Sequence, residues 1–170
     1  MKLLDYNTFS SNFSIPSWEE ADMLIPEFSE FKVTDYKTGK SWRMMRTSGK
    51  YHADVEPVTK SDTQIMNSVF VKDKSFEGAH YRPVIIEKDG LRYGAALMGF
   101  PHAGSLETKF KETTPKRSGG FGEGPNWDYI RDNDAIGHFC LHFKGSIRHT
   151  DEKTDDKAQE AIDKLFNLAK

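Results

Sequence analysis

Apolar and polar side chains alternate most regularly in segment 137–143, which reads Gly-His-Phe-Cys-Leu-His-Phe. At the two-residue period of a β-strand, its apolar side chains share one face, and its histidines and cysteine share the other. We therefore expect a strand that packs on the core with one face and presents three titratable groups on the opposite face. The apolar set is Phe139, Leu141 and Phe143, and the titratable set is His138, Cys140 and His142.

Two other alternating stretches are interrupted by turn sequences and predict β-hairpins. The first runs from 31 to 46 around the turn Lys-Thr-Gly-Lys, and the second runs from 83 to 100 around Lys-Asp-Gly. A shorter extended piece is expected at 51–55. The returning strand of the second hairpin contains three small residues that leave room for another element or a ligand. These are Gly94, Ala95 and Ala96.

Capping patterns and apolar stripes predict two or three helices. A Ser-x-x-Glu capping box begins at Ser17, and its short helix is expected to end before Pro26. Thr59 is expected to cap a helix that extends to about Phe70. Apolar residues recur at helical spacing through 154–169, which indicates a C-terminal helix that lies on a sheet.

Segment 105–134 is long, charged and rich in glycine. No Lys-Ser or Lys-Thr pair follows its glycines, so it is not a phosphate-binding loop. A loop of this length inside a small domain is typical of a lid or binding loop. We interpret it as a flap beside the strand at 137–143, and a flexible solvated loop is the equal alternative.

Together these elements predict an α+β, β-rich fold. We expect a mainly antiparallel sheet or sandwich with the C-terminal helix packed on it and a long flap at about 105–134. The length of 170 residues favours a single domain, 1–170. Within it, residues 1–29 are expected to form an N-terminal arm and a short helix, and residues 30–169 the core.

Charge and cysteine content narrow the functional classes. The chain has 24 basic and 26 acidic residues, which predicts no general attraction to nucleic acid or to anionic membranes. No signal peptide is recognisable at the start, and no apolar run approaches the roughly 20 residues that span a bilayer. We expect a protein that is cytoplasmic as synthesised, or released by lysis as a phage product would be. The oligomeric state stays open.

The first candidate chemistry is a thiol nucleophile at Cys140, the only cysteine. Same-face neighbours on a strand lie roughly 6–7 Å apart, so His138 and His142 flank this thiol without reaching it directly. A base from another strand is therefore favoured, and His102 is the leading candidate. The alternative is that Cys140 is a small buried hydrophobe. Substrate-binding candidates are His142, Arg148, His149, His52 and Asp54.

Two alternatives use the same residues differently. A non-catalytic protein would bind or sequester a small polar or peptide ligand in a pocket of histidine, cysteine and arginine. A zinc-dependent hydrolase is the third hypothesis, because histidine, cysteine and aspartate supply suitable ligands. Their spacing matches no zinc motif, so we assign no metal ligand and no cofactor. The candidate ligands for such a metal are His138, Cys140, His142, His149, His52 and Asp54.

The segments Pro-His-Ala-Gly at 101–104 and Gly-His-Phe-Cys-Leu at 137–141 resemble a degenerate form of the L,D-transpeptidase (YkuD-type) signature. That signature has a His-Gly pair and then Ser-His-Gly-Cys-Ile-Arg on a later strand. Gly137, Phe139 and His142 stand where it has Ser, Gly and Arg. Residues 30–169 are also similar to a little-characterised bacterial domain of Gram-positive cell-wall proteins.

This resemblance implies a β-rich fold and acylation of Cys140 by a peptide stem of the peptidoglycan type. It also implies His102 or His138 as the base and backbone amides near Cys140 as oxyanion donors. The leading hypothesis is therefore a thiol-dependent acyl transferase or hydrolase, that is, a cysteine transpeptidase or hydrolase.

Overall fold

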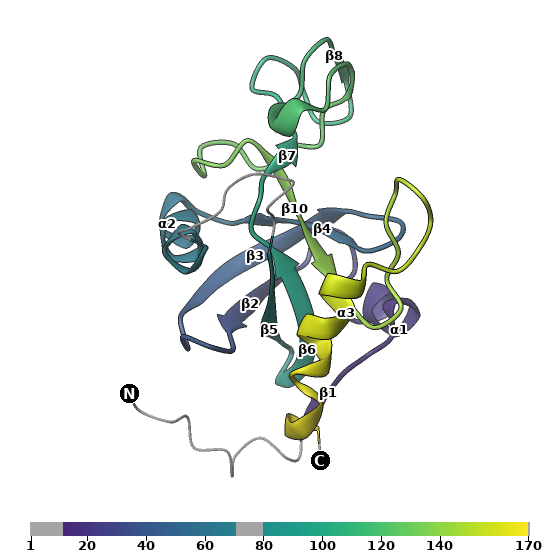
Figure 1. The fold of residues 1–170 in the computed structure, drawn as a ribbon. Coiled ribbons are helices and arrows are strands. Elements are labelled where there is room, and N and C mark those ends of the chain that lie inside the picture. The colour runs from purple at the N-terminus through teal and green to yellow at the C-terminus, as the bar shows by residue number, and fades with distance from the viewer. Residues whose placement is uncertain (1–11, 71–79, 170) are drawn as a thin grey trace.

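A six-stranded antiparallel barrel forms the centre of the protein in the computed structural model, which describes residues 12–70 and 80–169 (Figure 1). The strand order within these residues is β6-β5-β2-β3-β4-β10, and a pairing of β10 with β6 closes the ring. The six strands are β2 (Glu30–Asp35), β3 (Ser41–Ser48), β4 (Ala53–Pro57), β5 (Tyr81–Lys88), β6 (Leu91–Met98) and β10 (Gly137–His142).

Alternation along each strand decides which side chains fill the barrel. The inward positions in the middle of each strand are apolar and together form one hydrophobic core. Phe139 and Leu141 of β10 lie in this core, and the opposite face of β10 therefore points outward. The two hairpins and the two-faced strand are confirmed. The inward side chains include Phe31, Val33, Trp42, Met44, Ala53, Val55, Val84, Ile86, Tyr93, Ala95 and Leu97.

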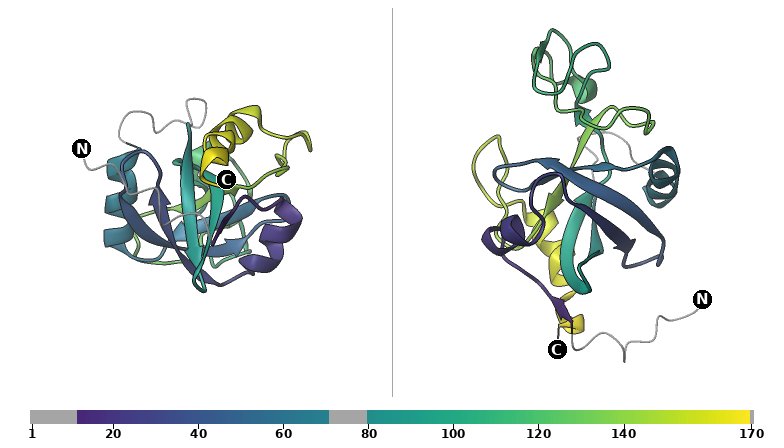
Figure 2. Two further views of the ribbon diagram at one scale, coloured as in Figure 1. Left: turned by 90° about the horizontal axis from the view of Figure 1, so that it is seen from below. Right: turned by 180° about the vertical axis from the view of Figure 1, so that it is seen from behind.

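Two helices lie on opposite sides of the barrel and contribute to the same core (Figures 1 and 2). The helix α1 (Trp18–Leu24) starts at the predicted capping box on Ser17, and α2 (Lys60–Val69) starts at the predicted cap on Thr59. Both boxes are complete, because the side chain and the backbone of each cap residue both bond to the third helical residue.

The C-terminal helix α3 (Asp156–Asp163) lies along the outside of the barrel and is shorter than expected (Figure 1). A 3-10 turn, η3 (Phe166–Leu168), follows it. The small residues of β6 explain its position, because Ala96 packs with Ala158, Ala161 and Ile162 of α3. A Cβ on Gly94 would lie 3.0 Å from Ile15 and 3.2 Å from Leu165. The space that Gly94 and Ala96 leave is thus filled by both the C-terminal segment and the segment that contains Ile15.

The chain from β7 (His102–Ala103) to β10 forms a lobe at one end of the barrel, at the top of Figure 1. Side-chain bonds to the backbone hold this expected flap together. Asn126 donates to the carbonyls of Ser105 and Thr108, and Arg117 donates to those of Phe121 and Glu123. Its short elements are β8 (Thr113–Thr114), η2 (Ser118–Gly120) and β9 (Gly124–Pro125).

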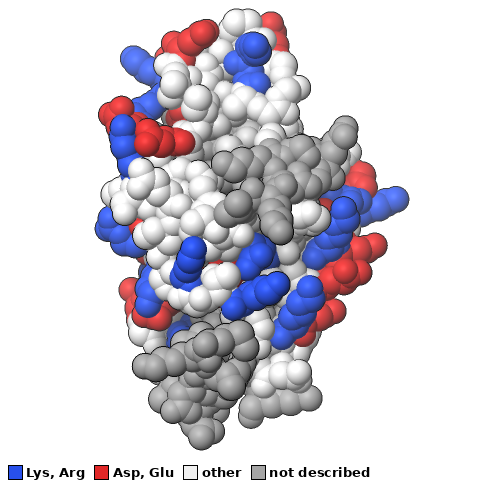
Figure 3. All heavy atoms as spheres, turned by 60° about the vertical axis from the view of Figure 1, so that its left-hand side comes forward, with Lys and Arg blue, Asp and Glu red and all other residues white. Residues whose placement is uncertain are grey.

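The expected N-terminal arm lies mostly outside the described residues. Its described end forms β1 (Phe13–Ser14), which pairs in parallel with β6. On the face shown in Figure 3, basic and acidic side chains are interspersed. Within 12–70 and 80–169, no helix is both long and apolar enough to cross a membrane.

Candidate functional site

Five of the six histidines gather around the outward face of β10. Strand pairing explains the gathering, because β10 lies between β4 on one side and β6 and β7 on the other. His138 and His142 come from β10 itself, whereas the other three come from β7, the residue just before β4 and the loop after β10. Those three are His102, His52 and His149.

His102 is the histidine within hydrogen-bonding distance of the thiol. Its Nε2 lies 3.6 Å from Cys140 Sγ, and its Nδ1 donates to the Phe100 carbonyl at 3.0 Å. The carbonyl can only accept, so it holds the proton on Nδ1 and leaves the Nε2 lone pair facing the sulfur. His102 is paired with His138 across the two strands, which makes it a diagonal neighbour of Cys140. The catalytic roles of these residues remain predictions.

Glycine at two positions allows β7 to approach β10 this closely. A Cβ on Gly137 would lie 2.1 Å from the His102 carbonyl oxygen, and a Cβ on Gly104 would lie 2.3 Å from the Gly137 backbone. Gly137 also has a φ of +99°, which side chains rarely adopt. The difference from the signature at this position therefore has a steric cause, since a serine would displace His102.

Phe139 does not obstruct the site. Its side chain is 1% exposed and lies in the barrel core, on the face of β10 opposite to Cys140. The Phe139 backbone has ordinary strand pairing with Val55.

Burial dominates the electrostatics of the thiol. Burial raises the pKa of Cys140 well above its usual range, and the carboxylate of Asp54 raises it further. Burial also lowers the pKa of His102 to about 3, and His138 adds to this effect. The resting pair is thus a neutral thiol beside a neutral imidazole.

Asp54 lies between two histidines. It is paired with Cys140 across β4 and β10, and its Oδ1 is 3.5 Å from His52 Nε2 and 3.4 Å from His138 Nε2. Burial alone would raise the pKa of Asp54, but His138 and His52 outweigh that effect and hold the pKa below its usual value. Its second oxygen, Oδ2, accepts from the Ser48 hydroxyl at 2.8 Å.

His142 belongs to a separate part of the cluster. Its ring stacks on that of His52 with a centroid separation of 4.3 Å, and its Nε2 lies 3.3 Å from the Tyr81 hydroxyl. Burial, followed by the neighbouring His52, lowers the pKa of His142 well below the ordinary value. His142 therefore rests as a neutral side chain.

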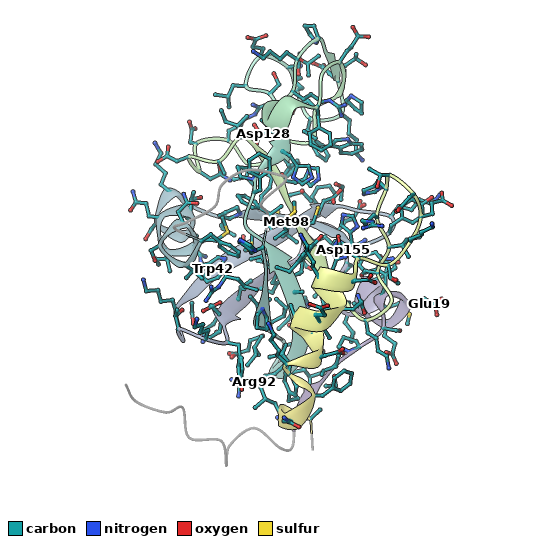
Figure 4. All side chains as sticks on the ribbon, viewed as in Figure 1. Glu19, Trp42, Arg92, Met98, Asp128 and Asp155 are labelled. Atoms are coloured by element: carbon teal, nitrogen blue, oxygen red, sulfur yellow. The ribbon has the colours of Figure 1, made fainter. Side chains whose placement is uncertain are left out.

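Two cavities meet at the cluster, among the residues that the structure describes. One, of about 810 Å³, is lined by Asp54, His138 and the basic residues Arg46 and Arg117. The other, of about 720 Å³, is lined by Cys140 and by Met98 and Asp155, which Figure 4 labels. Both volumes lie within the ordinary range for ligand pockets. The residues that line both cavities are His102, Phe121 and His149.

The remaining predicted substrate residue, Arg148, lines the cavity that contains Cys140. Its guanidinium donates to both carboxylate oxygens of Asp151, with the shorter contact at 2.6 Å. The structure therefore brings all eight predicted site residues to the two cavities, although it places Arg148 at an exposed edge where Asp151 already binds it.

Three residues that line or support the site were missed by the sequence analysis. Tyr81 bonds to His142, Phe121 stacks on His102 at a centroid separation of 5.1 Å, and Glu56 accepts the backbone amides of Tyr129 and Ile130. Burial raises the pKa of Glu56 to about 7, although those amides lower it. For Glu56, the alternation of His52, Asp54 and Glu56 on one strand face was the available signal.

Comparison with known proteins does not place the chain in a family. No protein-family model, curated protein or solved structure matches it.

Proposed function

We propose that the protein is a thiol-dependent acyl transferase or hydrolase that acts on peptides, in the manner of an L,D-transpeptidase. One observation carries this proposal: Cys140 Sγ lies 3.6 Å from His102 Nε2, and the Phe100 carbonyl fixes the opposite nitrogen of the same ring. A nucleophile, a base and a group that orients the base are the three parts that nucleophilic catalysis needs. The second cavity gives the thiol access to a ligand.

The proposed reaction has two steps. Cys140 Sγ attacks a peptide carbonyl carbon while its proton passes to His102 Nε2. The carbon–nitrogen bond then breaks, His102 returns the proton to the leaving amine, and a thioester remains on Cys140. An amine or a water molecule next attacks the thioester, and its proton passes through His102 to the sulfur, which restores the thiol.

A neutral resting pair is compatible with this sequence of steps. As the sulfur attacks, its proton moves to His102, so the imidazolium forms together with the negative charge on the substrate oxygen. Each charge stabilises the other in a buried site where the effective dielectric constant is low. Attack and proton transfer are therefore concerted. A peptidoglycan-type stem as substrate and backbone amides near Cys140 as oxyanion donors are the finer parts of the proposal, and they rest on the resemblance in segments 101–104 and 137–141.

The test uses the fact that Cys140 is the only cysteine. Intact mass after incubation with a carbapenem is expected to show one covalent adduct on the wild-type protein and none on Cys140→Ala. His102→Gln is expected to slow adduct formation, whereas His80→Ala, which changes an exposed histidine, should leave it unchanged. Absence of an adduct on the wild type, together with full activity of Cys140→Ala on peptide substrates, would refute the proposal.

Burial of the thiol supports a second candidate function. Cys140 is 7% exposed and its pKa is raised, which are also the properties of an unreactive cysteine. The protein would then bind or sequester a small polar or peptide ligand in the two cavities without reacting with it. Ligand binding that Cys140→Ala leaves intact, with no adduct on the wild type, would favour this second function.

A further inference from the structure

Two hydrogen-bond acceptors, His52 Nε2 and Asp54 Oδ1, face each other across a buried gap. His52 Nδ1 donates to the Ile147 carbonyl at 2.9 Å, which leaves the lone pair on Nε2. That nitrogen lies 3.5 Å from Asp54 Oδ1, and the two side chains are 3% and 8% exposed. Neither atom has a hydrogen-bond partner within the part of the chain that the structure describes. Two buried acceptors in this arrangement require a positive charge between them.

The distance between the two atoms favours a metal ion over a proton. A hydrogen bond between nitrogen and oxygen is usually about 2.7–3.2 Å long, which is shorter than this gap. Two ligand atoms on a tetrahedral zinc ion, with bonds of about 2.0–2.2 Å, lie roughly 3.3–3.6 Å apart. The gap of 3.5 Å between His52 Nε2 and Asp54 Oδ1 fits the second geometry.

The groups behind both ligand atoms hold them in place. His52 is oriented by the Ile147 carbonyl, and the Ser48 hydroxyl donates to Asp54 Oδ2, which leaves Oδ1 directed at the gap. A histidine whose second nitrogen donates to a carbonyl, and a carboxylate whose second oxygen accepts a hydrogen bond, are the usual outer-shell partners of metal ligands.

A third ligand comes from the loop after β10. The ligand atoms of His52, Asp54 and His149 all lie within 4.8 Å of one another. The ring of His149 meets that of His52 edge-on with a centroid separation of 4.7 Å. His149 is exposed and lines both cavities, so an ion can enter from solvent and keep a coordination position open to a ligand.

We propose that His52 Nε2, Asp54 Oδ1 and His149 bind a divalent transition-metal ion, with zinc as the probe. Two imidazoles and one carboxylate suit zinc and neighbouring first-row metals, and three protein ligands with one open position are typical of a reactive rather than a structural site. His138 Nε2 lies 3.4 Å from the same carboxylate oxygen and is therefore a neighbour of the proposed ligand Asp54.

Two other groups of side chains have metal-ligating atoms within the same distance, and both include the thiol. They are His52 with Cys140 and His142, and His102 with His138 and Cys140. Both would use the thiol that the proposed function assigns as the nucleophile, and the first would also break the contact between His142 Nε2 and the Tyr81 hydroxyl. The proposed site neither uses the thiol nor breaks that contact, and it is therefore independent of acyl transfer at Cys140.

The test is a titration of the full-length, chelator-treated protein with Zn²⁺ against a chromophoric chelator. One equivalent is expected to bind. His149→Ala, His52→Ala and Asp54→Ala should each weaken binding about tenfold or more, by analogy with the effect of removing even outer-shell groups. Cys140→Ser and His80→Ala should bind as the wild type does. Because His149 is exposed, its variant keeps the test decisive if the buried variants fail to fold.

Co²⁺ distinguishes the proposed ligands from the thiol groups. The proposed site predicts a cobalt spectrum without the near-ultraviolet charge-transfer band of a Co²⁺–thiolate bond. The proposal is overturned if the wild type shows that band and Cys140→Ser does not. It is also overturned if His149→Ala binds Zn²⁺ as tightly as the wild type, or if the wild type binds no Zn²⁺. Carbapenem acylation of Cys140 can persist or fail in either case, so failure of the proposed function is recognised separately.

Discussion

Gly137 lies directly against the backbone of His102, so that a Cβ on Gly137 would be 2.1 Å from the His102 carbonyl oxygen. The two residues belong to β10 and β7, and their contact brings the His102 ring to the thiol of Cys140. The position of the proposed base thus depends on the absence of a side chain one strand away. The L,D-transpeptidase signature has a serine at the position of Gly137, so substitution of Gly137 by serine tests whether this contact positions His102.

Gly137→Ser is expected to displace His102 and to destabilise the fold by about 1–3 kcal/mol, because it adds a steric clash to a positive φ. Urea unfolding and the rate of iodoacetamide reaction with Cys140 measure the two effects. Gly120→Ser is the matched control, since Gly120 has a φ of +78° and nothing within 4 Å of its added Cβ. Equal effects of the two substitutions would show that the contact with His102 does not matter.

Phe139→Leu is expected to lower the free energy of unfolding by about 1–2 kcal/mol, because it leaves a cavity in the barrel core. The reaction rate of Cys140 should stay within twofold of the wild type, since the Phe139 side chain points away from the thiol. Urea unfolding and iodoacetamide kinetics on the same samples measure both quantities. A large rise in thiol reactivity at unchanged stability would mean that Phe139 shields Cys140.

Much of the fold follows from local signals in the sequence. The capping box at Ser17, the cap at Thr59, the two hairpin turns and the alternation in 137–143 all correspond to observed elements. Closure of the strands into a barrel could not be read from these signals, because it depends on the non-local pairing of β6 with β10.

The sequence predicted which residues gather at the candidate site but not how they are arranged there. The alternation placed Cys140 outward and made His138 and His142 poor partners for it, and cross-strand pairing then brought His102 to the sulfur. The gap between His52 and Asp54 was not foreseeable, because it depends on the Ile147 carbonyl and the Ser48 hydroxyl, which come from other segments. The high pKa of Cys140 was also missed, since burial depends on the complete fold.

The ion pair of Asp35 with Arg82 predicts acid sensitivity. Burial favours the protonated acid, but hydrogen bonds from Arg82 and Thr38 outweigh it and hold the pKa of Asp35 below its usual value. A depressed pKa in the folded state means that the stabilisation is present above the unfolded pKa of about 3.8 and is lost as the pH falls through the folded value.

Asp35→Asn is therefore expected to destabilise the protein at neutral pH by about 1–3 kcal/mol, because it removes charge-assisted hydrogen bonds to a buried carboxylate whose Arg82 partner is partly exposed. The difference between Asp35→Asn and the wild type in the free energy of unfolding should shrink as the pH falls below about 4. Urea unfolding at a series of pH values measures this difference. Glu160→Gln, which changes an exposed acid on α3, should show no such convergence, and a constant difference for Asp35→Asn would contradict the assignment.

Glu56 links the flap to the barrel, because its two carboxylate oxygens accept the amides of Tyr129 and Ile130 at 2.9 and 2.8 Å. Glu56→Gln keeps the size of the side chain but replaces one acceptor oxygen with a donor, so one of the two amides loses its partner. A buried amide without a partner costs about 1–3 kcal/mol. We expect the flap to open more often, and the rate of trypsin cleavage after Lys and Arg residues in 105–134 to rise about tenfold or more.

Glu123→Gln is the control for this prediction, since Glu123 is an exposed acid of the same flap and its replacement should leave the cleavage rate unchanged. Acceleration at flap sites alone would show that Glu56 stabilises the closed flap over the two cavities. Equal acceleration at sites in the barrel strands would instead mean that Glu56→Gln unfolds the whole domain. Unchanged cleavage at every site would show that the two amide bonds do not hold the flap.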